Sequence, residues 1–120
     1  MANVRFEAAG ALMHLANSPE LQMELASLCL TRVCTLINES DLEAEIMSML
    51  NLAGVLAVDL PANQVHIAHT GLLPRILQLM QHPHAGVCEL ATRLMGTVAE
   101  AESNRYRFDR MVMQIGRAHV

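Results

Sequence analysis

Histidine and cysteine side chains at short spacings are the residues of this chain that could do chemistry. His66 and His69 lie three residues apart, so a helix would place both imidazoles on one face, where they could ligate a metal ion. A zinc site needs three or four ligands with supporting groups, and no third ligand is indicated nearby. Cys88 could be a nucleophile if His84 acted as its base, but no orienting acid or oxyanion donor accompanies the pair. We therefore predict no metal site, no cofactor and no catalytic residue.

Charged residues are sparse and gather in two places. The chain has a formal net charge of −4 and no lysine, which argues against nonspecific nucleic-acid binding because such binding depends on positive charge. The acidic group and the arginine group are Glu39, Asp41, Glu43 and Glu45, and Arg105, Arg107, Arg110 and Arg117. The arginines beside Tyr106 could grip a phosphate or an acidic peptide, but solvated helix faces are the simpler interpretation of both groups.

Cysteine usage and hydropathy limit the cellular locations that the sequence favours. The three cysteines are odd in number and lack metal-like CxxC spacing, which favours a reducing compartment. The longest apolar run covers residues 52–58, far short of the roughly 20 residues that span a bilayer. Arg5 and Glu7 interrupt any signal-peptide pattern at the N-terminus. We expect no contact with membranes and a cytoplasmic, possibly nuclear, location.

Apolar residues recur at gaps of three and four along most of the chain, a pattern typical of amphipathic helices. The clearest stretch, residues 71–99, predicts two helices joined by a polar break at 81–86. Further helices are predicted over about 3–16, 19–28, a short segment around 33–37, 40–58, 61–69 and 102–113. Ser18 before Pro19 predicts an N-cap, Ser40 with Glu43 predicts a capping box, and Gly71 predicts a left-handed turn. The expected fold class is all-α.

The helical segments recur at a constant offset, which we call the repeat step. Matched residues at steps of 41 or 42 are Pro19 and Pro61, Glu45 and Val87, Leu15 and Leu56, and Asn63 and Asn104. A step of this length with three helices per unit indicates an α-solenoid, in which each unit buries its apolar stripe against the next unit.

Two segments carry a resemblance to a known family. FEAAGALMHLA at 6–16 is similar to the third helix of armadillo repeats, as found in importin-α and the catenins. NQVHIAHTGLLPRILQLM at 63–80 resembles the first and second helices, with Gly71 at their junction. The resemblance covers about residues 4–108 and implies a right-handed α–α superhelix with about two full repeats and partial repeats at both ends. We expect one domain over residues 1–113, an irregular tail over 114–120, and a fragment of a longer repeat protein whose exposed ends could self-associate.

In the resembled family the third helices line a concave groove, and two positions four residues apart on each helix face the ligand. The matching positions are Gly10 and His14, Asn51 and Val55, and Arg93 and Thr97. The resemblance therefore implies a noncatalytic protein–protein interaction module that binds a peptide or protein partner at these residues. The ladder of paired Trp and Asn residues that nuclear-import receptors place here is missing, which argues against binding of import signals. A structural spacer without a ligand of its own stays open as the alternative.

Gly54 and Gly96 lie inside predicted long helices, where glycine costs about 1 kcal/mol relative to alanine. Such glycines allow either the close approach of a neighbouring helix or room for a ligand backbone. We predict close packing at both positions. The methionines are interpreted as core filler, although they could also form an adaptable binding surface.

Overall fold

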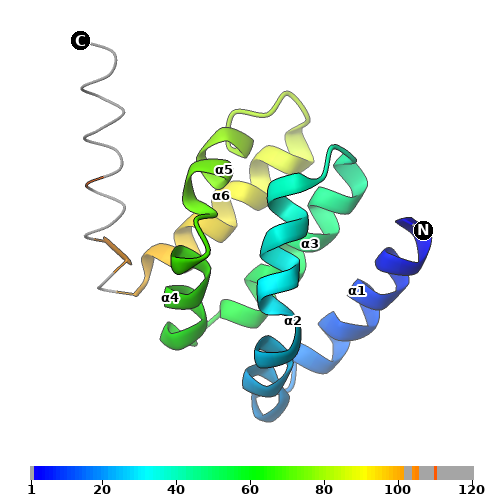
Figure 1. Ribbon diagram of the computed structural model, residues 1–120, viewed down its shortest axis with the longest axis vertical. Helices are drawn as coiled ribbons and strands as arrows, with labels where there is room; N and C mark the ends of the chain where they lie inside the picture. The colour runs from blue at the N-terminus through cyan, green and yellow to red at the C-terminus, as the bar shows by residue number, and fades with distance from the viewer. Residues whose placement is uncertain (1, 102–103, 106–109, 111–120) are drawn as a thin grey trace.

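The computed structural model describes residues 2–101, 104–105 and 110, with side chains from residue 7 onward. Six helices follow in order (Figure 1): α1 (Ala2–Ala16), α2 (Pro19–Glu39), α3 (Glu43–Ala57), α4 (Pro61–His69), α5 (Leu73–Leu79) and α6 (Ala85–Ala99). No strand occurs in this part of the chain, so the all-α prediction is confirmed. The expected helix over 102–113 falls mostly outside the described residues, although Asn104, Arg105 and Arg110 are helical, and the expected tail over 114–120 lies wholly outside them.

The six helices form two layers. α3 lies at the centre of one layer, with α1 packed on one side of it and α6 on the other (Figure 1). α2 packs on α3, and α5 packs on α6. α4 links the two groups, because it contacts α2, α3 and α6.

The core sits between these layers and repeats along the chain. Leu52 and Leu56 of α3 are fully buried, and so are Leu94 and Val98, which follow them by one repeat step on α6. In each helix these residues are four apart and therefore lie on the same face. The repeated stripe explains why the two helices occupy equivalent places in the fold.

One predicted boundary is wrong, because α2 is a single helix that runs from Pro19 to Glu39 without the expected end near residue 28. In the following unit the chain breaks between α4 and α5, where Gly71 has a φ of 78° and Pro74 lies in the first turn of α5. The residues one repeat step earlier are Cys29 and Arg32. Both can adopt helical dihedrals and donate a backbone hydrogen bond, so nothing interrupts α2.

The capping box predicted at Ser40 is also wrong. Ser40 is the C-cap of α2, and its hydroxyl accepts a hydrogen bond from the backbone N–H of Leu42 at 3.2 Å. α3 begins at Glu43, after an N-cap residue, Leu42, that has no capping side chain. Ser18 does occupy the N-cap of α2 ahead of Pro19, but its side chain makes no capping hydrogen bond.

Buried amide side chains form hydrogen bonds with backbone carbonyls at the C-terminal ends of α3 and α6. The Asn63 amide donates to the carbonyl of Leu56 at 2.7 Å, and the Asn104 amide donates to the carbonyl of Val98 at 3.0 Å. The Asn104 amide also donates to the carbonyl of Gln64 at 2.8 Å. The last carbonyls of a helix lack partners within it, so these amides satisfy groups that would otherwise be buried without a hydrogen bond. Two residues separated by one repeat step thus have the same structural role.

Long polar side chains connect neighbouring helices in a similar way. The Gln22 amide donates to the carbonyls of Val55 and Val58 at the C-terminal end of α3, at 2.8 and 2.9 Å. The Arg75 guanidinium, on α5, donates to two carbonyls at the C-terminal end of α2, at 3.0 and 3.2 Å. The bonds of Gln22 connect α2 to α3, and those of Arg75 connect α5 to α2 of the preceding unit.

Candidate functional site

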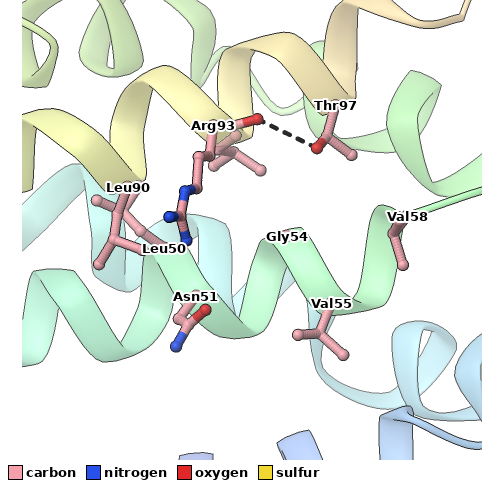
Figure 2. A pocket seen from close by; sticks show the side chains of 9 residues that line it. Leu50, Asn51, Gly54, Val55, Val58, Leu90, Arg93 and Thr97 are labelled. Atoms are coloured by element: carbon pink, nitrogen blue, oxygen red, sulfur yellow. Dashed lines mark hydrogen bonds between the residues drawn. The ribbon is translucent and has the colours of Figure 1, made fainter.

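Two adjoining hollows form a groove across α1, α3 and α6. The first has a volume of about 250 Å³ and lies between α3 and α6 (Figure 2). The second, of about 270 Å³, lies between α1 and α3 and extends to α6. Asn51 and Leu90 line both hollows, so the two hollows lie next to each other.

Most of the residues that the sequence indicated for partner binding come together in this groove. Asn51, Val55, Arg93 and Thr97 line the first hollow, and Gly10 lines the second. His14 lines neither hollow and lies exposed in the last turn of α1. The structure therefore places five of the six positions along two neighbouring hollows.

The glycines of the long helices do not mark close packing, and that prediction is wrong. A Cβ atom built on Gly54 or on Gly96 would meet no heavy atom within 4 Å. Gly54 lines the first hollow, whereas Gly96 is exposed on α6. Larger side chains also line the hollow between α3 and α6, among them Leu50 and Leu94, which are fully buried. Gly54 consequently faces open space between the helices.

The polar groups of the groove differ in their hydrogen bonding. Arg93 extends from α6 toward α3 (Figure 2), and its guanidinium makes an exposed ion pair with Glu89 at 2.7 Å. The Thr97 hydroxyl donates to the backbone carbonyl of Arg93 at 3.1 Å. Asn51 is exposed, and its amide makes no hydrogen bond within the described part of the chain. This amide offers both a donor and an acceptor to a ligand.

The histidines have structural contacts that the sequence did not indicate. His66 Nε2 lies 2.9 Å from the Thr31 hydroxyl and connects α4 to α2. His84 is the N-cap of α6, and its Nδ1 accepts hydrogen bonds from the backbone N–H groups of Gly86 and Val87 at 3.2 and 3.4 Å. A histidine cap lies outside the usual Ser, Thr, Asp and Asn set, so the sequence carried little signal for it.

The cysteines are thiols in apolar or hydrogen-bonded surroundings. Cys88 donates to the backbone carbonyl of Met80 at 2.9 Å, and His84 serves as a helix cap, so the two do not form a nucleophile and base. Burial raises the pKa of Cys29, and it raises the pKa of Cys34 from 9.0 to about 11. A raised pKa disfavours the reactive thiolate. Among the described residues, no three His, Cys, Asp or Glu side chains are grouped so that they could hold a metal ion.

Comparisons with known proteins add no family assignment. No model of a known protein family matches the chain, and no curated protein or solved structure matches it either. Within the residues that the structure describes, none of the helices combines the length and apolarity needed to cross a membrane.

Proposed function

We propose that this chain is a noncatalytic protein-interaction module that binds an extended peptide segment of a protein partner in the groove across α1, α3 and α6. The observation that carries the proposal is that Asn51 lines both neighbouring hollows, with Gly54 open beside it. A peptide backbone could approach α3 closely over a residue without a side chain. The neighbouring Asn51 amide could then hydrogen-bond to that backbone.

We further propose that the helices are armadillo-type repeats in a right-handed superhelix. In this arrangement α1, α3 and α6 act as successive third helices, and α4 and α5 act as the first and second helices of one repeat. α2 replaces the corresponding pair in the preceding repeat. The equivalent roles of Asn63 and Asn104, separated by one repeat step, support this arrangement, as does the similar packing of α3 against α1 and α6.

The groove favours a ligand with little net charge. Its walls are apolar at Leu50, Val55 and Leu90, and Glu89 neutralises the charge of Arg93. Arg93 and Glu89 together carry no net charge, so this wall of the groove does not favour a strongly charged ligand. We therefore expect extended segments with aliphatic side chains and a free backbone, bound with modest affinity because the groove is short.

Free thiols fit a reducing compartment, cytoplasmic or nuclear.

A peptide library displayed on phage, selected on the immobilised chain, tests the proposal. Enriched sequences would be synthesised and their affinity measured by isothermal titration calorimetry. Gly54→Leu should abolish binding because the leucine would occupy the first hollow, and the open space around Gly54 lets the variant fold. Gly96→Leu is the matched control, since it makes the same change at the equivalent place on α6, outside the residues that line the hollows.

The second candidate function is that of a structural spacer within a larger scaffold. It is favoured by the absence of a dense set of polar groups in the groove, where Asn51 alone of the three polar side chains lining the first hollow lacks a hydrogen bond within the described residues. Failure to enrich any peptide, or equal binding by the wild type and by Gly54→Leu, would support the spacer and overturn the groove.

A further inference from the structure

The turn between α5 and α6 holds two histidines whose ring nitrogens accept hydrogen bonds from the backbone. His84 Nδ1 accepts from the N–H groups of Gly86 and Val87 at 3.2 and 3.4 Å. His82 Nδ1 accepts from the N–H group of His84 at 3.0 Å. A backbone N–H group can only donate, so neither Nδ1 carries a proton, and the proton of each neutral ring lies on Nε2. The observed turn therefore requires both imidazoles to be neutral.

Protonation of the two rings removes these acceptors. An imidazolium carries a proton on both nitrogens and accepts no hydrogen bond. The N–H groups of Gly86 and Val87, which lie in the first turn of α6, would lose the acceptor that caps them. The new positive charge would also lie at the N-terminal end of a helix, where the macrodipole disfavours a cation. Because histidine takes up its proton between about pH 8 and 5, the cap is present at neutral pH and lost in mild acid.

The other titratable groups around His84 do not restore the cap. In the part of the chain that the structure describes, Glu43 of α3 faces the ring, with 3.8 Å between His84 Nε2 and the carboxylate, and both side chains are about half exposed. Their attraction after protonation is that of a surface ion pair, which contributes little and supplies no acceptor to the backbone N–H groups. His82 would add a second cation to the turn. Cys88, one turn further along α6, directs its thiol to the carbonyl of Met80.

The first turn of α6 also contacts a residue that lines the groove. A Cβ atom on Gly86 would lie 2.6 Å from the terminal methyl carbon of Met47, so this methyl group lies against the backbone of the turn. Met47 lines the second hollow, together with Leu90, which follows Gly86 by one turn of α6. A rearrangement at the start of α6 would therefore change the surroundings of Met47 in the second hollow.

We infer that the turn between α5 and α6 is an acid-sensitive switch. Protonation of His82 and His84 releases the first turn of α6 and, with it, the methyl group of Met47. The folded chain needs the two rings neutral, whereas the unfolded chain does not, so the unfolded state binds more protons and stability falls as the pH falls. The inference does not depend on the proposed peptide binding, because every group that it uses belongs to the folded chain itself.

Nuclear magnetic resonance of the full chain tests the switch. At pH 8, long-range ¹H–¹⁵N spectra should show both rings as the tautomer with the proton on Nε2. With ¹³C-labelled methionine methyl groups, the Met47 signal, assigned by its loss in Met47→Leu, should move between pH 8 and 5.5 in step with the protonation of His84. The double variant His82→Asn/His84→Asn should hold this signal constant, because asparagine side chains accept the same backbone hydrogen bonds and do not titrate in this range.

Urea denaturation provides the second measurement. Between pH 7.5 and 5.5 the unfolding equilibrium constant of the wild type should rise about fivefold more than that of the double variant, which is the loss of a typical N-cap expressed as a ratio. His14→Asn is the matched control, since His14 is exposed in the last turn of α1, away from this turn, and the variant should keep the acid response of Met47. A proton on Nδ1 of His84 at pH 8, or an equal acid response in the wild type and the double variant, would overturn the inference.

Discussion

Replacing Gly54 by alanine should stabilise the protein. Gly54 lies within α3, and glycine inside a helix costs about 0.5–1 kcal/mol relative to alanine because its backbone loses more freedom on folding. The new methyl group would meet no heavy atom within 4 Å, so no steric term opposes this gain. We therefore expect the free energy of unfolding to rise by about 0.5–1 kcal/mol.

A change of this size is measurable. For a domain of this length, about 1 kcal/mol corresponds to a rise in Tm of roughly 3–6 °C. Urea denaturation followed by far-UV circular dichroism should give a higher midpoint with an unchanged m-value. The m-value depends on the surface exposed on unfolding, and the substitution changes that surface by a single methyl group. Gly96→Ala should behave in the same way, because Gly96 also faces open space.

Gly86→Ala provides the contrast. A Cβ atom at Gly86 would lie 2.6 Å from the terminal methyl carbon of Met47, so this side chain would have to move. We expect Gly86→Ala to gain less stability than Gly54→Ala. A loss of stability in Gly54→Ala would refute our reasoning, since it would mean that the residue packs closely against another part of the molecule.

Three further predictions concern turns, titration and cross-unit bonds. Gly71→Ala should lower the free energy of unfolding by about 1 kcal/mol in urea denaturation, because φ at this residue is 78°. Between pH 9 and 11 the wild type should lose about 2 kcal/mol of stability, because the thiol ionises above pH 9 in the unfolded chain, whereas burial raises the pKa of Cys34 in the folded state to about 11 and keeps it protonated. Cys34→Ala should lack this component of the pH dependence, and a similar loss in that variant would contradict the assignment. Arg75→Ala should cost about 1–3 kcal/mol, measured by thermal unfolding, because it leaves the carbonyls of Ile37 and Ser40 without their donor.

Much of the fold followed from local pattern. The gaps of three and four among apolar residues predicted the long helices α3 and α6, because a helical stripe is visible within a few turns of sequence. Gly71 predicted the left-handed turn between α4 and α5, and its φ of 78° confirms it. The break that was wrongly expected in α2 has no residue to cause it, because Cys29 and Arg32 stand where the following unit has Gly71 and Pro74.

The candidate groove could not be predicted from the spacing of residues in the sequence alone. A spacing of four placed Asn51 and Val55 on one face of α3, but it did not show that this face borders a hollow that extends to α1 and α6. The role of His84 as the N-cap of α6 was equally hidden, because it depends on the rotamer that brings Nδ1 to two backbone N–H groups.

By itself, the sequence determined most of the helical segments, which side of each is apolar, and the step at which these features recur, because all three can be read from the order of residues along the chain. Only the tertiary structure decided whether Gly54 meets a neighbouring helix or open space, and which leucines remain uncovered on α1 and α2. The physical reason is that the distance between two helices depends on the largest side chains on both of them. Those side chains come from segments a whole repeat step apart, so no local pattern contains the answer.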